Sequence, residues 1–194
     1  MKLCFASNNE HKLTEVRQIL AAQYEILSLQ DIGCHEELPE EQETLEGNSH
    51  QKANHVWQHY NISCFADDTG LEVMALNGEP GVYSARYAGA QRSNHDNMQL
   101  LLQKLEGNPD RRAQFRTSIT LILDGQVNQF NGIVTGTIAQ APSGEKGFGY
   151  DPIFIPDGFN QTFAQMGSEQ KNSISHRGRA LQALAAFLKN YNTQ

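Results

Sequence analysis

Two adjacent carboxylates, in Phe65-Ala66-Asp67-Asp68-Thr69-Gly70, directly follow a short apolar run. The run predicts a strand over 62–66, and Asp67–Gly70 then predicts a turn. In α/β sheets, ligands bind beyond the carboxyl ends of strands. Because adjacent side chains diverge, only one carboxylate need face such a site, where it could hold Mg²⁺ or position a water molecule. A plain Asx-type turn explains the same residues, so both interpretations stay open.

A second polar turn lies near the N-terminus. The apolar run 3–6 predicts a strand, and Ser7-Asn8-Asn9 has helix-capping chemistry. A helix then follows from apolar residues at i, i+3 and i+7, namely Leu13, Val16 and Leu20. The free N–H groups and the dipole of such a helix favour a phosphate, and Lys12 adds charge one turn in. A capped surface helix with a solvated lysine explains this segment equally well, and the P-loop pattern GxxxxGK(S/T) is absent.

Two later segments could bind a nucleoside. In Gly144–Asp151 the glycines let backbone approach a ligand, Phe148 offers an aromatic face for a base, and Asp151 offers an acceptor. The segment 171–179 concentrates cations in an acidic chain, and Lys171, His176 and Arg177 could contact phosphate or base. A mobile loop and exposed cations are the plainer explanations.

Carboxylates are also concentrated in the irregular segment 30–43. Most of these glutamates are expected to be solvated, but one of them could complete a metal site with Asp68. The histidines His55 and His59 stand at i, i+4 without a third ligand, so we interpret them as surface residues rather than a zinc site.

Helices and strands alternate early in the chain, and a hairpin dominates its middle. Thr44 is expected to cap a helix to about Tyr60, and a further strand over 71–76 ends at the hairpin signal Asn77-Gly78. The later elements are predicted as a helix over 93–105, a hairpin over 113–139, a strand over 153–155 and a last helix from near His176. This order predicts an α/β domain with a mixed sheet.

Composition narrows the function. The 194 residues are 39% hydrophobic and carry a formal charge of −7 with a pI near 5.4. An acidic chain is a poor candidate for binding a nucleic acid polymer but suits a divalent cation. Three cysteines, an odd number without a CxxC pair, suit a reducing compartment, and no apolar run approaches a membrane span. We therefore expect a cytoplasmic protein without a membrane partner.

Taken together, the motifs resemble one family. The pattern SxNxxK near the start is followed by TLEGNxxxKA, ADDTGL, PGVYSARYAG, GFGYDPIF and SHRGxAL. In this order they resemble the inosine triphosphate pyrophosphatases, also called the Ham1-like family, over residues 3 to about 188. The resemblance implies Mg²⁺-dependent hydrolysis of ITP, dITP and XTP to the monophosphate and pyrophosphate. It also implies a homodimer and an elongated single domain over 1–194, with a long central mixed sheet and the active-site cleft between two lobes.

The resemblance also implies roles for particular residues. Asp68 would be the catalytic base, and Glu40 and Asp68 would lie at the metal, with Glu41 as the alternative to Glu40. The substrate-binding residues implied are Ser7, Asn8, Asn9, Glu10, His11, Lys12, Lys52, Thr69, Phe148, Gly149, Tyr150, Asp151, Lys171, His176 and Arg177. Those up to Lys12 would contact the triphosphate, and Phe148–Asp151, His176 and Arg177 the nucleoside.

Two alternative functions stay open. One is a related pyrophosphatase that acts on a different base, such as a modified pyrimidine. The other is a nucleotide sensor without catalysis, although a pure binder has no need of a hydrolytic carboxylate.

Overall fold

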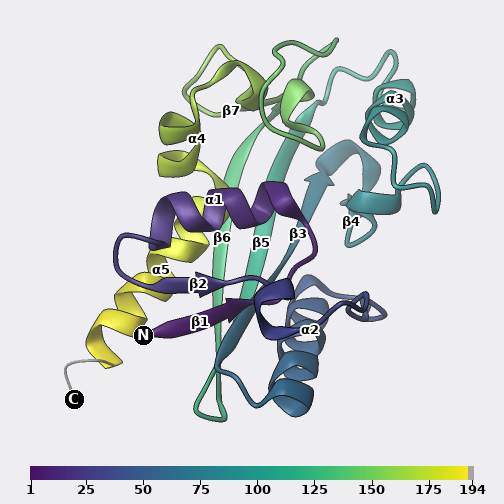
Figure 1. The fold of residues 1–194 in the computed structure, drawn as a ribbon. Coiled ribbons are helices and arrows are strands. Elements are labelled where there is room, and N and C mark those ends of the chain that lie inside the picture. The colour runs from purple at the N-terminus through teal and green to yellow at the C-terminus, as the bar shows by residue number, and fades with distance from the viewer. Residues whose placement is uncertain (192–194) are drawn as a thin grey trace. The chain divides into compact units, whose positions relative to one another are not determined.

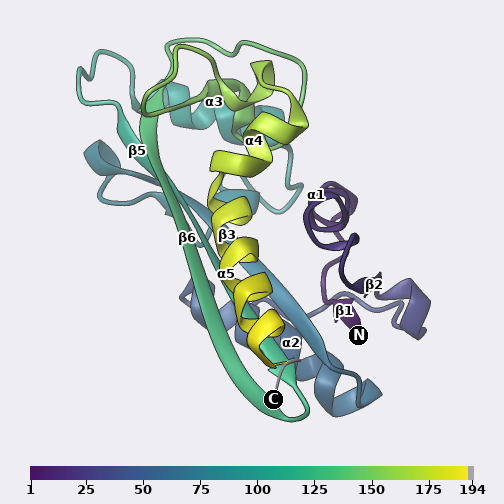
Figure 2. The same ribbon diagram turned by 90° about the vertical axis from the view of Figure 1, so that its left-hand side faces the viewer.

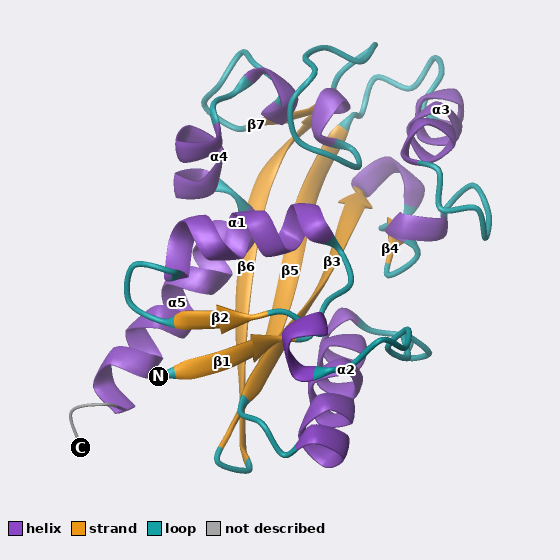
Figure 3. Ribbon diagram, in the orientation of Figure 1, coloured by secondary structure: helices purple, strands orange, loops and turns teal. Residues whose placement is uncertain are grey.

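The computed structural model describes residues 1–191, which form an α/β fold around a seven-stranded sheet. Six strands follow the order β2-β1-β3-β5-β6-β7, and β4 pairs with β3. Strand β1 runs parallel to β2 and β3, whereas β4 and β7 pair antiparallel with their neighbours. The sheet is therefore mixed, as predicted (Figure 3).

The elements have the following bounds. The strands are β1 (Lys2–Phe5), β2 (Glu25–Leu27), β3 (Cys64–Val73), β4 (Pro80–Gly81), β5 (Arg112–Leu123), β6 (Gln126–Ile138) and β7 (Phe154–Pro156). The helices within the described residues are α1 (Glu10–Leu20), α2 (Leu45–Tyr60), α3 (Asn94–Lys104), α4 (Ser168–Ile174) and α5 (His176–Tyr191), as Figure 1 shows.

The chain divides into two compact units. Of the described residues, unit 1 comprises Met1–Asp68, Thr117–Gly132 and 177–191, and unit 2 comprises Thr69–Arg116 and Ile133–His176. Strands β3, β5 and β6 each contribute residues to both units. The expectations of one domain and of a cleft between lobes remain predictions.

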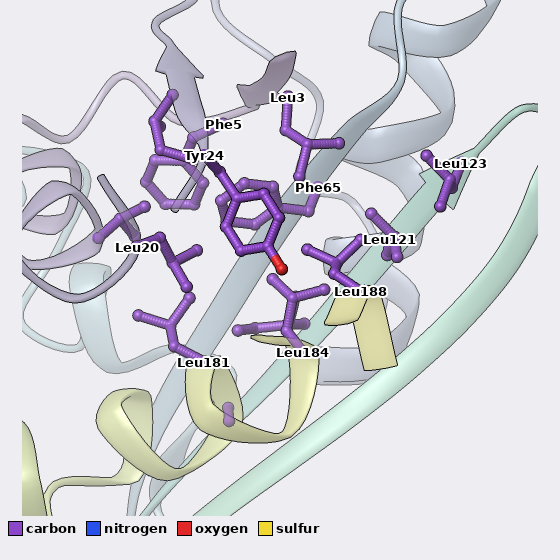
Figure 4. Packing of buried hydrophobic residues seen from close by; sticks show 14 of the residues in the cluster. Leu3, Phe5, Leu20, Tyr24, Phe65, Leu121, Leu123, Leu181, Leu184 and Leu188 are labelled. Carbon is purple, nitrogen blue, oxygen red and sulfur yellow. The ribbon is translucent and has the colours of Figure 1, made fainter. Parts of the chain in front are cut away.

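Unit 1 has an apolar core that holds α1 and α5 against the sheet. Leu181, Leu184 and Leu188 of α5 pack with Leu121 and Leu123 of β5, as Figure 4 shows. The leucine spacing of i, i+3 and i+7 is the one that predicts this helix. Near the end of α5, Tyr191 donates a hydrogen bond to Asp124 in the β5–β6 turn (3.1 Å), and Figure 2 shows the end of α5 beside that turn.

Helix α2 packs on a separate apolar cluster in unit 1. Ala53 and Val56 of α2 lie there with Ala66 of β3 and Ile122 of β5. Ile122 stands between Leu121 and Leu123, and successive strand residues point to opposite faces. The two clusters of unit 1 therefore cover opposite faces of the sheet.

Unit 2 has its own core. Leu101 and Leu105, at the end of α3, lie in one apolar cluster with Phe154 of β7. The same cluster contains Phe115 and Phe163, and the rings of these two residues stack with their centres 6.2 Å apart. This core anchors the loop 144–151, because Tyr150 is buried in the same cluster.

The structure corrects the local prediction at Asp67–Gly70. These residues do not turn, because β3 runs without interruption from Cys64 to Val73. Extended pairing thus takes precedence over the turn propensity of Asp and Gly. A Cβ at Gly70 would lie 2.6 Å from the carbonyl oxygen of Gly81, so this glycine permits the close approach of β4. Helix α4 was not predicted, and residues 74–76 form a 3₁₀ turn rather than strand.

Candidate active site

The two aspartates of β3 face opposite sides of the strand. Asp67 accepts a hydrogen bond from the Lys12 ammonium at 2.9 Å, and Asp68 accepts one from the Asn48 amide at 3.0 Å. Lys12 belongs to α1 and Asn48 to α2, which cover opposite faces of the sheet. The prediction that the two side chains diverge is therefore confirmed.

Asp67 belongs to a buried network of charges in unit 1. One carboxylate oxygen meets Lys12, and the other meets the Arg177 guanidinium at 3.0 and 3.1 Å. Burial alone would raise the pKa of Asp67, but the charges of Lys12 and Arg177 outweigh it and hold that pKa below its ordinary value. Arg177 also contacts Glu15 of α1 at 2.5 Å.

Asp68 lies among the polar residues of α2. Its pKa is raised chiefly because burial disfavours the charged form, and the nearby Lys52 opposes this shift without cancelling it. A carboxylate with a raised pKa is a stronger proton acceptor, which suits a general base. Asn48 and Lys52 of α2 therefore stabilise the charged form of Asp68, but not enough to bring its pKa down to the ordinary value.

Lys52 lies between carboxylates in unit 1. Its ammonium contacts Glu40 at 2.6 Å, and its side chain is only 5% exposed. Burial would lower the pKa of Lys52, but Asp68 and Glu40 raise it overall. Glu41 lies apart from this group: it is exposed, and its carboxylate contacts Gln51. Of the two glutamates, Glu40 is thus the one placed beside Lys52.

The N-terminal turn has the capping geometry that the sequence predicts. The Asn9 side chain caps α1 by accepting from the backbone N–H of Lys12 at 3.2 Å, and Ser7 Oγ accepts from Asn9 N–H at 3.2 Å. Asn8, Glu10 and His11 are exposed. This helix end therefore presents backbone N–H groups and the positive end of the helix dipole.

A second polar group lies in unit 2. The Lys171 ammonium contacts the Asp151 carboxylate at 2.7 Å, and both side chains are buried. The same carboxylate oxygen accepts from the backbone N–H of Phe148 at 2.8 Å. Lys171 also lies 5.1 Å from the centre of the Phe148 ring, within cation–π range. Three residues predicted to bind substrate are therefore brought together here.

His176 extends this group. It is 4% exposed, and its ring stacks on Phe115 at 4.5 Å. Phe163 connects the two parts, since it lies 6.3 Å from His176 and 5.8 Å from the Lys171 ammonium. The Tyr150 hydroxyl donates a hydrogen bond to the Ser84 carbonyl at 2.8 Å. Thr69 is half-buried in unit 2.

The donor set in unit 1 fits a divalent cation such as Mg²⁺. Within residues 1–191, no group of three or more His, Cys, Asp or Glu side chains is placed to hold a metal ion. Mg²⁺ does not require such a group, because it is usually bound by one or two carboxylates, water and substrate phosphates. Glu40 and Asp68 both raise the pKa of Lys52, so both carboxylates lie close enough to one cation to stabilise its charge.

Sequence reasoning missed the partners of these charges. Glu15 and Asn48 have no predicted role, yet they bind Arg177 and Asp68. One signal was present for Glu15: it follows Lys12 by three residues, which places both on one face of α1.

An α/β sheet whose strands carry buried carboxylates beside lysines is a fold suited to binding a polyphosphate together with a divalent cation. The chain matches the family model described as the Ham1 family over residues 3–187, and it belongs to that family. Among the described helices, none combines the length and the apolar character that crossing a bilayer requires.

Similar proteins cover nearly the whole chain. The dITP/XTP pyrophosphatase of Flavobacterium psychrophilum is 54% identical over 190 residues, which is 98% of this chain and 100% of the relative. That of Flavobacterium johnsoniae is 55% identical over 97% of this chain and 98% of its own. The solved structure of the Staphylococcus aureus Ham1 protein superposes with a TM-score of 0.89 at 41% identity, covering 98% of this chain and all of the other.

Proposed function

We propose that this chain hydrolyses dITP, ITP and XTP to the nucleoside monophosphate and pyrophosphate, with Mg²⁺ as cofactor. Relatives at 54% and 55% identity are dITP/XTP pyrophosphatases. The observation that carries the proposal is the group of buried lysines and carboxylates in unit 1. In this group Asp68 has a raised pKa and lies within electrostatic reach of Lys12, Lys52 and Glu40.

In this proposal, unit 1 holds the triphosphate. The N-terminus of α1 and the ammonium groups of Lys12 and Lys52 bind phosphate oxygens. Glu40 and Asp68 would hold Mg²⁺, which when bound neutralises phosphate charge and polarises the bond to be broken. Fixed positive charge of this kind stabilises the transition state of phosphoryl transfer without reorganisation.

Asp68 acts as the base. Its carboxylate accepts a proton from a water molecule whose oxygen attacks the α-phosphorus. The bond between the α-phosphorus and its bridging oxygen breaks, and pyrophosphate leaves. The raised pKa of Asp68 favours this proton transfer.

Unit 2 recognises the nucleoside. Phe148 offers its ring to the base, and Phe148–Asp151 form the loop around the base edge. Hypoxanthine and xanthine carry an acceptor at C6 where adenine carries an amino donor. A donor from His176 would pair with the first two bases and be left unpaired by adenine, which can discriminate by roughly 10⁴-fold in favourable sites. Arg177, which the family resemblance also assigns to the nucleoside, is buried in unit 1, where Asp67 and Glu15 hold its guanidinium.

The expected setting of the enzyme also rests on the family. We propose a cytoplasmic homodimer that removes deaminated purine nucleotides from the nucleotide pool. Sedimentation of the purified protein tests the dimer: a single species at monomer mass over micromolar concentrations would reject it.

Hydrolysis in ¹⁸O-labelled water tests the reaction itself. Attack at the α-phosphorus puts the label into the monophosphate and leaves pyrophosphate unlabelled. Label in pyrophosphate would reject α-attack, and release of orthophosphate in place of pyrophosphate would reject the pyrophosphatase assignment.

A further inference from the structure

Three ion pairs among four charged side chains of unit 1 form a ring that the backbone of α1 closes. Lys12 contacts Asp67 Oδ1 at 2.9 Å, and Asp67 Oδ2 contacts Arg177 Nη2 at 3.0 Å. Arg177 Nη1 contacts Glu15 Oε2 at 2.5 Å, and Glu15 lies one turn after Lys12 on α1. The ring thus joins α1, β3 and α5 and returns to α1, with positive and negative charges in alternation.

The ring is shielded from water, most of all at its centre. Side-chain exposure is 1% for Asp67 and 2% for Arg177, against 13% for Lys12 and 14% for Glu15. Two cations and two carboxylates balance there. If Glu15 were removed, Asp67 would be the one carboxylate that remains within this ring of four side chains for its two cations.

Glu15 determines how the two carboxylate oxygens of Asp67 are divided between Arg177 and Lys12. Arg177 offers Nε and Nη2 to the same oxygen of Asp67, at 3.1 and 3.0 Å. Its third nitrogen, Nη1, is turned to Glu15. A guanidinium is a rigid fork, so fixing Nη1 fixes the other two nitrogens. This orientation leaves Oδ1 of Asp67 to Lys12.

We propose that Glu15 is a positioning residue for the reaction: by fixing Arg177 it reserves one oxygen of Asp67 for Lys12, and so holds the Lys12 ammonium at the phosphate-binding end of α1. This inference rests on the proposed function. Glu15 itself touches neither substrate nor metal in this account, and it acts through Arg177 and Asp67.

A purely structural role for the ring is the competing explanation. Buried ion pairs are weak sources of stability, because the loss of hydration offsets much of the attraction between the charges. The positioning role makes a different demand, since it requires that Glu15 lose its effect when Lys12 is removed. A double-mutant cycle separates the two explanations.

The experiment measures single-turnover hydrolysis of dITP with enzyme in excess, so that slow variants remain measurable. The variants are Glu15→Gln, Lys12→Met and the double variant, with Mg²⁺ present. We expect Glu15→Gln to lower the rate about 10-fold in the wild-type background but less than about twofold in the Lys12→Met background. The enzyme concentration that gives half the maximal single-turnover rate should change less than the rate itself.

The matched control is Glu25→Gln, which removes an exposed carboxylate paired with Lys2 at 3.0 Å. It should leave the rate unchanged. If Glu15→Gln does not fold, Glu15→Asp takes its place; this variant keeps the charge on a shorter side chain and should lose the rate in the same Lys12-dependent way.

Two results would overturn the inference. One is a rate for Glu15→Gln within twofold of wild type, and the other is an equal loss in both backgrounds, which would assign Glu15 a structural role only. An inactive wild-type protein would instead reject the proposed function, so the two failures are distinguishable.

Discussion

Asp67 and Asp68 are neighbours on β3, yet their carboxylates are held in opposite ways. Asp67 meets the cations Lys12 and Arg177, and its pKa is lowered. Asp68 accepts from the neutral amide of Asn48, and its pKa is raised by burial. One carboxylate is therefore stabilised as an anion, and the other is kept as an acceptor of protons.

Replacing Asp68 by Asn should abolish turnover while making the fold more stable at neutral pH. Burial disfavours the charge of Asp68 in the folded state, so its cost appears as the pH rises above the ordinary pKa near 3.8 and is removed by a neutral amide. Thermal unfolding at about pH 7 should give a higher Tm for the variant. A variant with near-wild-type activity would refute the assignment of Asp68 as the base.

Replacing Asp67 by Asn should have the opposite effect on stability. It removes the buried carboxylate that pairs with both Lys12 and Arg177, and breaking a buried ion pair in this way typically costs about 3 kcal/mol of unfolding free energy. Chemical denaturation of both proteins measures the difference. An unchanged free energy of unfolding would mean that this charge network contributes nothing to the fold.

The pH dependence of that difference follows from the lowered pKa of Asp67. The stabilisation is fully present above the ordinary pKa of 3.8 and is lost as the pH falls through the lower pKa of the folded state. The difference in unfolding free energy between wild type and Asp67→Asn should therefore stay constant from about pH 5 to 8 and become smaller only in stronger acid. A difference that disappears already near neutral pH would contradict the lowered pKa.

Much of the fold was predictable because it depends on local patterns. The spacing of its leucines predicts α5, and the capping residues up to Asn9 predict the start of α1. The turn predicted over Asp67–Gly70 was wrong, because these residues lie in β3 and pair with neighbouring strands that the local sequence does not reveal. Glu15 was missed for the same reason, since its partner Arg177 lies 162 positions away.

Replacing Gly147 by Ala should impair the nucleoside loop. Gly147 has a φ of +75°, and a Cβ there would lie 2.1 Å from the Asp151 carboxylate oxygen that binds Lys171. We expect kcat/KM for dITP to fall about 10-fold or more, because the loop that carries Phe148 must shift.

Gly158→Ala is the matched control for this substitution. Gly158 has a similar φ of +85°, but nothing lies within 4 Å of its added Cβ. The Gly158→Ala variant therefore has the same kind of backbone strain as Gly147→Ala but no steric clash, and the enzyme should keep its activity. Equal losses in both variants would show that strain, rather than the clash with Asp151, is responsible.

The buried cysteines Cys4 and Cys64 should resist alkylation in the native protein. Burial raises the pKa of each thiol to about 12, so little of the reactive thiolate exists at pH 8. Mass spectrometry after iodoacetamide treatment should find both unmodified until denaturant is added. Modification of either at the rate of a free thiol would contradict their burial.

Pyrophosphate release from dITP, XTP, ITP, GTP, ATP and dTTP, each measured with Mg²⁺ and with EDTA, tests the proposed activity. We expect rapid Mg²⁺-dependent release from dITP, XTP and ITP, with ATP slower by orders of magnitude. Activity shifted to dTTP or spread over all six substrates would contradict the assigned base-recognition residues, and no release from any of them would contradict the enzyme itself.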